Sequence, residues 1–131
     1  MRKKIIWVVD DDPIFKIIVR KIIEKSEMFE TPTTFQHGLD AITALKNSLD
    51  EITKLPDAII LDIDMPVMDG WEFMEEMIRL KPQITKKIAI YIASSSIAAE
   101  DKHKAKTFPD ILNYFSKPVT LENLHLIASS D

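Results

Sequence analysis

The stretch Ala58-Ile59-Ile60-Leu61-Asp62-Ile63-Asp64-Met65-Pro66-Val67-Met68-Asp69-Gly70 decides the architecture of this chain. Its first four residues form a short apolar run, which is typical of a strand buried on both faces of a parallel sheet. Asp62 follows at once, where the strand is expected to run out into a turn. Because an unpaired buried charge is costly, a carboxylate in this place indicates a function rather than core packing.

A second acidic group stands in the same position after another apolar run. Asp10, Asp11 and Asp12 follow the run of residues 5–9. If the two strands are parallel neighbours, both groups of acids lie at one edge of the sheet, and ligands of open α/β sheets gather at that edge. Taken alone, the three aspartates could be only a turn in which one of them caps the first helix.

Five apolar runs predict strands, and helical patterns alternate with them. Strands are expected at residues 5–9, 29–35, 58–61, 88–92 and 114–116, and helices at 13–24, 38–45, 71–80, 98–106 and 121–128. The apolar face of the first helix is expected to hold Ile14, Phe15, Ile18, Val19, Ile22 and Ile23. Strict β-α alternation predicts an α/β fold, a doubly wound five-stranded parallel sheet with helices on both faces, as a single domain over residues 1–131.

The composition excludes several classes of protein. At 131 residues, with 46% hydrophobic and 29% charged residues, the chain is an ordinary soluble domain. Its net charge of −4 disfavours binding to nucleic-acid phosphates. The lack of cysteine excludes disulfides and thiolate metal sites. No stretch approaches the length of a membrane span, so we expect a cytoplasmic protein without membrane contact. Both ends of the sequence lie close to predicted elements, so we expect no second domain.

The polar residues that follow the predicted strands favour phosphoryl chemistry. Carboxylate oxygens suit Mg²⁺, and without a cation the clustered acids repel one another. Lys117, just past the fifth strand, supplies an ammonium group, and the triplet Ser94-Ser95-Ser96 after the fourth supplies a hydroxyl. Such groups orient a transferring phosphoryl group and offset its charge. An aspartate can itself be the nucleophile and form an aspartyl phosphate.

Four ordered motifs make the chain resemble the bacterial response-regulator receiver domains, in particular the stand-alone chemotaxis type. The motifs are Val9-Asp10-Asp11-Asp12-Pro13, the loop from Leu61 to Gly70, Ser94-Ser95 and Lys117-Pro118. The resemblance covers essentially the whole chain and implies a flavodoxin-like strand order, 2-1-3-4-5. It also implies a switch of a two-component signalling system rather than a turnover enzyme. Such a switch accepts a phosphoryl group from a histidine kinase or phosphotransfer protein and signals by contact with a downstream protein.

The resemblance implies a role for each acid of the site. Asp62 is the phosphoacceptor and a ligand of Mg²⁺. Asp11 ligates the metal directly, and Asp10 ligates it through water or orients it. The backbone carbonyl of Asp64 completes the protein ligands. Asp12 falls outside the site.

The resemblance also implies the groups that act on the phosphoryl group. Lys117 pairs with it, and the hydroxyl of Ser94 hydrogen-bonds to it, with Ser95 as the alternative. Tyr114 stands at the aromatic switch position, although a purely structural role is equally compatible with its pattern. Residues 109–113 replace a glycine that often precedes the fifth strand in this family, which predicts a loop of different shape there.

Two other functions fit parts of the pattern. Asp62-Ile63-Asp64 also resembles the nucleophile motif of haloacid-dehalogenase-type phosphatases, but there the motif usually lies on the first strand of a longer chain. A degenerate receiver that only binds partners is the second alternative. The intact acidic pair, Asp62 and Lys117 disfavour it.

Overall fold

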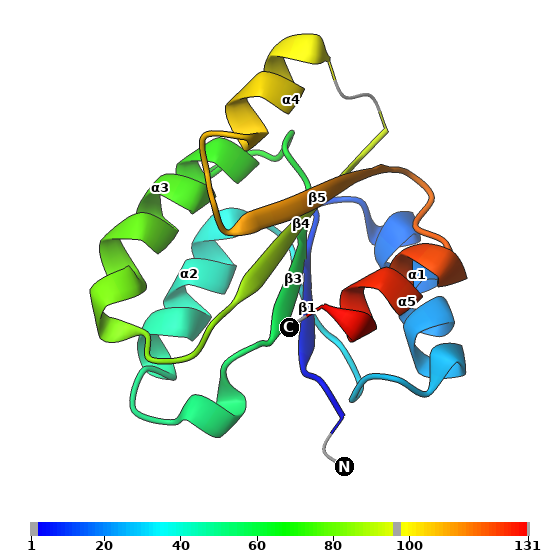
Figure 1. The fold of residues 1–131 in the computed structure, drawn as a ribbon, viewed down its shortest axis with the longest axis horizontal. Coiled ribbons are helices and arrows are strands. Elements are labelled where there is room, and N and C mark those ends of the chain that lie inside the picture. The colour runs from blue at the N-terminus through cyan, green and yellow to red at the C-terminus, as the bar shows by residue number, and fades with distance from the viewer. Residues whose placement is uncertain (1–2, 96–97, 131) are drawn as a thin grey trace.

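The computed structural model describes residues 3–95 and 98–130, in which a five-stranded sheet lies between two layers of helices (Figure 1). The strands are β1 Ile6–Val9, β2 Thr33–Phe35, β3 Ala58–Leu61, β4 Ala89–Ser94 and β5 Ile111–Ser116. The α-helices are α1 Pro13–Ser26, α2 Gly38–Asn47, α3 Gly70–Leu80, α4 Ala99–Ala105 and α5 Leu121–Ser129, and Ile52–Lys54 and Lys81–Gln83 are short 3₁₀ turns. None of the described helices is long and apolar enough to cross a membrane. Ser96 lies outside the described residues.

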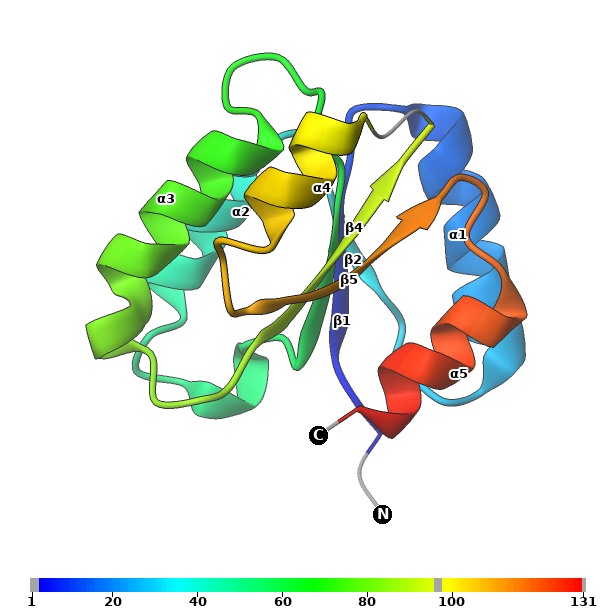
Figure 2. The same cartoon turned by 45° about the horizontal axis from the view of Figure 1, so that its top comes forward.

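The sheet is parallel throughout, with the strand order β2-β1-β3-β4-β5. This confirms the predicted doubly wound, flavodoxin-like fold. Helices α1 and α5 cover one face of the sheet, and α2, α3 and α4 lie on the other side (Figure 2). Val9 pairs with Leu61 in the β1–β3 ladder, so the next residue of each strand emerges at the same edge. That register brings Asp10 beside Asp62.

Two apolar cores, one on each face of the sheet, hold the strands in place. The core under α2 and α3 contains Trp7 and Phe73, and the core under α1 and α5 contains Phe15, Tyr91 and Phe115. The central strands β1 and β3 are buried along their whole length. This burial fits the uninterrupted apolar runs from which those strands were predicted.

The outer strands differ from their predicted ranges because pairing, not local pattern, sets their length. The loop expected at 109–113 is wrong for its last three residues, since Ile111 already pairs with Ile90 and Asn113 with Tyr91, whereas residues 109 and 110 form a turn. Leu112 is the extra residue of the resulting bulge, which absorbs the mismatch between the two strands. At the other edge β2 begins only at Thr33, after Pro32, which has no N–H group to donate to a ladder.

The predicted apolar face of α1 is too wide. The buried stripe consists of Phe15, Val19 and Ile23, which follow one another at intervals of four residues. Ile14 and Ile18 precede stripe residues by one position, a rotation of about 100° around the helix. They are therefore turned away from the sheet, with 66% and 47% of their surface exposed.

Candidate functional site

Four polar side chains come together where the strands end. Asp10 follows β1, Asp62 follows β3, Ser94 is the last residue of β4 and Lys117 follows β5. Backbone hydrogen bonds continue the sheet past these positions: Asp62 N–H donates to the carbonyl of Val9 at 3.0 Å, and Lys117 N–H donates to that of Ser94 at 2.9 Å. The structure thus brings the predicted site residues to one edge of the sheet.

Asp10, Asp11 and Asp62 form the acidic side of the site. One carboxylate oxygen from each lies within 4.8 Å of the other two. Asp10 and Asp62 are buried and Asp11 is exposed, so the cluster opens to solvent on one side only. Three carboxylates at this spacing are the hard oxygen donors that Mg²⁺ prefers, and the residues present therefore fit a divalent cation.

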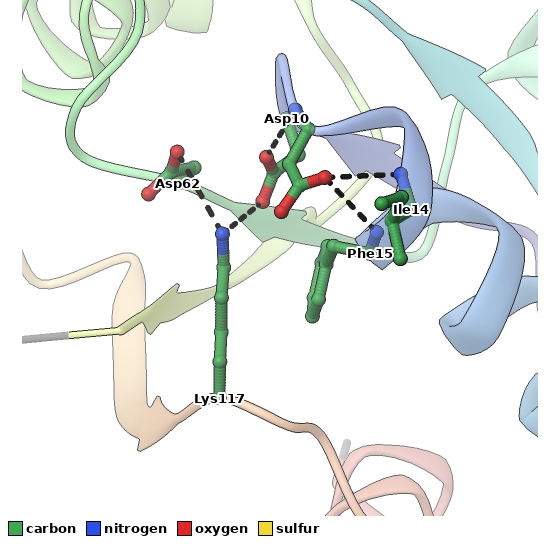
Figure 3. A network of polar contacts seen from close by, with 6 residues as sticks. Asp10, Ile14, Phe15, Asp62 and Lys117 are labelled. Carbon is green, nitrogen blue, oxygen red and sulfur yellow. Dashed lines mark hydrogen bonds and ion pairs between the residues drawn. The ribbon is translucent and has the colours of Figure 1, made fainter.

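Lys117 supplies the positive charge of the site. Its Nζ lies 2.7 Å from Oδ2 of Asp10 and 3.9 Å from Oδ2 of Asp62. Figure 3 shows the lysine side chain rising between the two carboxylates. One ammonium group therefore faces two buried carboxylates, and the exposed Asp11 adds a third carboxylate to the cluster, so negative charge exceeds positive charge among these four side chains.

This excess of charge and the burial of the site change how the acids ionise. Burial raises the pKa of Asp62 from 3.8 to about 6, with a further increase from the charge of Asp10 and an opposing effect of Lys117. Burial also raises the pKa of Asp10, against the hydrogen bond and charge of Lys117. A cation at the cluster would favour the ionised form of both acids.

Asp12 is a helix cap, as expected of a residue outside the site. Its carboxylate accepts hydrogen bonds from the N–H groups of Ile14 at 2.9 Å and Phe15 at 3.3 Å, which stabilises the first turn of α1. Its own N–H donates to Oδ1 of Asp10 at 2.9 Å. The acidic run therefore does two things: Asp12 starts the helix, and the same turn fixes the carboxylate of Asp10.

The loop after β3 passes closely behind Asp62. Gly70, the first residue of α3, donates its N–H to the carbonyl of Ile63 at 2.9 Å. A Cβ atom at Gly70 would lie 2.6 Å from the carbonyl oxygen of Asp62, so only glycine allows this approach. Asp64 is exposed on the same loop. Asp69 caps α3, since its carboxylate accepts a hydrogen bond from the N–H of Glu72 at 2.9 Å, and Gly70 adds the close packing behind Asp62.

The structure distinguishes the two candidate hydroxyl residues. Ser94 is buried at the end of β4, whereas Ser95 is exposed beyond it. Tyr114 lies on β5, half-buried, with Nζ of Lys102 5.4 Å from the centroid of its ring. Ser94 therefore belongs to the buried edge that carries the acids, and Tyr114 belongs to the surface beside α4.

Phe15 is a site residue that the sequence indicated only as core. Nζ of Lys117 lies 4.4 Å from the centroid of its ring. Phe15 belongs to the apolar stripe of α1, and its periodicity predicted burial and nothing more. The contact with Lys117 joins residues more than a hundred positions apart, and no local pattern signals such a pair.

The comparisons with known proteins agree with this geometry. The sequence profile described as "Response regulator receiver domain" matches residues 6–129. The DNA-binding transcriptional regulator NtrC of Escherichia coli is 28% identical over 123 residues, which are 93% of this chain and 23% of that protein. The chain thus spans about a quarter of the length of this curated relative.

Solved structures show the same fold. A two-component response regulator from Cytophaga hutchinsonii superposes with a TM-score of 0.86 at 29% sequence identity, covering 96% of this chain and 95% of that one. The chemotaxis protein CheY4 of Vibrio cholerae superposes with a TM-score of 0.74 at 22% identity, covering 95% and 94%. The second likeness shows the fold alone.

Proposed function

Because this chain belongs to the response regulator receiver domain family, we propose that it is a phosphoacceptor switch of a two-component system, phosphorylated on Asp62. The observation that carries the proposal is the position of that carboxylate. Asp62 is buried at the end of β3, 3.9 Å from Lys117, within an acidic cluster that fits a divalent cation. A histidine kinase or a phosphotransfer protein would supply the phosphoryl group.

The residues of the site fit the transfer step. An oxygen of ionised Asp62 bonds to phosphorus while the bond from phosphorus to the donor's imidazole nitrogen breaks, and the released imidazole takes a proton from solvent. With a pKa of about 6, Asp62 is mostly ionised at neutral pH and can act as the nucleophile. The ammonium group of Lys117 offsets the negative charge of the phosphoryl oxygens. The protein acts as a switch and not as a turnover enzyme.

The acidic cluster is the proposed Mg²⁺ site. Asp10, Asp11, Asp62 and the backbone carbonyl of Asp64 would hold the ion, with Asp10 acting directly or through water. When bound, Mg²⁺ would offset the charge of the carboxylates and of the phosphoryl oxygens. The fit rests on the carboxylate oxygens, which lie within 4.8 Å of one another, and on Lys117, which is shared between Asp10 and Asp62.

We propose further that Ser94 and Tyr114 transmit the phosphorylation. A phosphoryl group on Asp62 would accept a hydrogen bond from the hydroxyl of Ser94, and the ring of Tyr114 would turn inward. The surface of α4, β5 and α5 would then change and contact a downstream protein. The burial of Ser94 and the half-buried ring of Tyr114 support this scheme.

Intact mass tests the assignment of Asp62. The parent is treated with acetyl phosphate and Mg²⁺, and we expect a mass gain of one phosphoryl group that EDTA abolishes. Asp62→Asn should gain no mass, whereas Asp50→Asn, which alters an exposed carboxylate outside the acidic cluster, should gain it like the parent. Mass gain in Asp62→Asn would contradict the assignment, and indifference to EDTA would contradict the metal site. Steady turnover of an aryl phosphate would support a phosphatase instead.

Amide hydrogen exchange tests the transmission step. A phosphoryl mimic should change protection across residues 98–128 in the parent. In Ser94→Ala the phosphorylation of Asp62 should persist while the change in protection shrinks. Ser95→Ala is the matched control, because Ser95 is exposed. If the change shrinks in Ser95→Ala and persists in Ser94→Ala, Ser95 is the hydroxyl of the switch.

A further inference from the structure

Lys117 lies on the face of an aromatic ring as well as between two carboxylates. Its Nζ is 4.4 Å from the ring centroid of Phe15, 2.7 Å from Asp10 and 3.9 Å from Asp62. The side chain of Lys117 is 16% exposed, and Phe15 is 7% exposed. In Figure 3 the ring projects from the start of α1 toward the lysine side chain. The ammonium group therefore has three partners and little contact with water.

We propose that Phe15 is a positioning residue for phosphoryl transfer: the face of its ring holds the ammonium group of Lys117 beside Asp62. This inference rests on the proposed function of Asp62 and deepens it. A cation within about 6 Å of an aromatic ring centroid is attracted by the negative ring face, most strongly where water is excluded. The burial of both side chains meets that condition.

The Phe15 ring restrains the Lys117 side chain without neutralising its charge, which the carboxylates cannot do. Asp10 draws the ammonium group toward itself and away from the phosphoacceptor, as the distances of 2.7 and 3.9 Å show. Lysine has a flexible four-carbon stem, so a single ion pair leaves it considerable freedom. The Phe15 ring restricts Lys117 from the side of α1 without neutralising its charge. The full charge remains available to a phosphoryl group on Asp62.

The other lysine–aromatic contacts in the described residues show what is particular about this one. Lys102 lies 5.4 Å from the ring of Tyr114, and Lys104 lies 5.2 Å from the ring of Trp71. Both of those lysines are exposed on α4. The contact of Lys117 is shorter and largely removed from water. Core packing alone would explain the size of Phe15, but it would not require an aromatic face toward Lys117.

Fluorinated phenylalanines separate the charge of the ring face from its shape. Mono-, di- and trifluorophenylalanine at position 15 withdraw negative charge from the face with little change in volume. We expect the rate constant for phosphorylation by acetyl phosphate to fall stepwise, by about threefold to tenfold over the series. The same series at Phe29, which is 4% exposed in the same core, is the matched control and should leave the rate unchanged. A flat rate over the Phe15 series would overturn the inference and leave packing as its only role.

A second measurement reads the position of Lys117 without any phosphorylation. Protons over a ring face resonate upfield, so the ε-methylene protons of Lys117 should be shifted upfield in the parent, with Lys117→Arg used for assignment. The shift should be lost in Phe15→Leu and kept in Phe29→Leu. If Phe15→Leu keeps the shift, Lys117 is held by its carboxylates alone and the inference fails. A parent that shows the shift but takes up no phosphoryl group would instead contradict the proposed function.

Discussion

Both ends of the sheet hold carboxylates that pair with a lysine, but the surroundings of the two pairs differ. At the amino end, Asp57 precedes β3, accepts a hydrogen bond from the N–H of Ile5 at 2.7 Å and pairs with Lys86 at 3.2 Å. Lys86 also donates to the carbonyl of Leu55 at 2.6 Å. Asp57 and Lys86 thus pair with each other, and each also takes part in a hydrogen bond with the backbone.

At the carboxyl end the charges do not balance. Lys117 faces the buried Asp10 and Asp62, and Asp11 adds a third carboxylate. The carboxylates of Asp10 and Asp62 are only 1% and 8% exposed, against 17% for Asp57, and both face the same lysine. An ion pair such as Asp57–Lys86 contributes to the fold, whereas under the proposed function the buried carboxylates at the other end would be stabilised by a bound cation.

The same substitution, aspartate to asparagine, should therefore have opposite effects at the two ends. Asp57→Asn leaves the largely buried Lys86 without its counter-charge, since the two side chains are only 17% and 12% exposed. We expect the free energy of unfolding to fall by about 3 kcal/mol. Urea denaturation measures the change, with the exposed Asp50→Asn as control. A loss below about 1 kcal/mol would place this pair among ordinary surface ion pairs and remove the contrast.

At the carboxyl end Asp62→Asn should stabilise the protein in EDTA at neutral pH, by about 2 kcal/mol. The folded state holds the proton of Asp62 up to about pH 6, whereas an ordinary aspartate loses it near 3.8. The stability of the parent therefore falls as the pH rises from 3.8 to 6 and stays lower above that range. Asparagine removes this dependence, so its advantage should be full above about pH 6 and vanish near pH 4.

Urea denaturation in EDTA at several pH values provides the measurement. Asp64→Asn is the control, because its carboxylate is exposed on the same loop. A gain in Asp62→Asn that is equal at every pH would attribute the effect to packing and not to charge.

The sequence predicted those features of the sheet and the site that a single local pattern determines. The run from Ala58 to Leu61 gave the bounds of β3 as the structure has them, and the parallel order then placed Asp10 beside Asp62. Apolar runs and the acids that follow them are local signals. Parallel pairing converts them into a shared site without further information.

What the sequence missed depends on neighbours that are distant in the chain. Leu112 enters a bulge only because β5 must pair with β4, and Ile14 is exposed only because the sheet covers a single stripe of α1. The ring of Phe15 meets Lys117 because α1 and the end of β5 converge on one edge. Each of these outcomes needs the packed structure, since an apolar residue in the sequence does not specify what it contacts.

Magnesium should stabilise the carboxyl end of the sheet. At tenfold its Kd, Mg²⁺ should raise the free energy of unfolding by about 1.4 kcal/mol, because it binds only the folded cluster. Asp11→Ala should lose this response and, in EDTA, melt higher than the parent, since one repelling charge is gone. Thermal denaturation with Mg²⁺ and with EDTA measures both. Lower melting in EDTA with an intact Mg²⁺ response would make Asp11 a structural residue instead of a ligand.

The last contrast concerns backbone strain at two residues with positive φ, and its expected effect on stability is the smallest. Val67, in the loop after Asp62, has a φ of 69°, and Met68 donates its N–H to the carbonyl of Pro66 at 2.8 Å. This tight turn is rare and strained, and a β-branched side chain increases the cost. At the amino end, Glu27 has a φ of 60° as the C-cap of α1, where a left-handed residue is common.

Glycine at each position should separate the two kinds of turn. Val67→Gly should raise the free energy of unfolding by about 0.5–1 kcal/mol, because the relief of strain exceeds the entropy that glycine loses on folding. Glu27→Gly should change it by less than about 0.5 kcal/mol, because an unbranched residue is less strained and the entropy loss is the same. Urea denaturation of both variants in EDTA gives the comparison. Val67 is 70% exposed, so its removal leaves no cavity that could mask the gain. An equal effect at the two positions would mean that strain is not concentrated in the loop that follows Asp62.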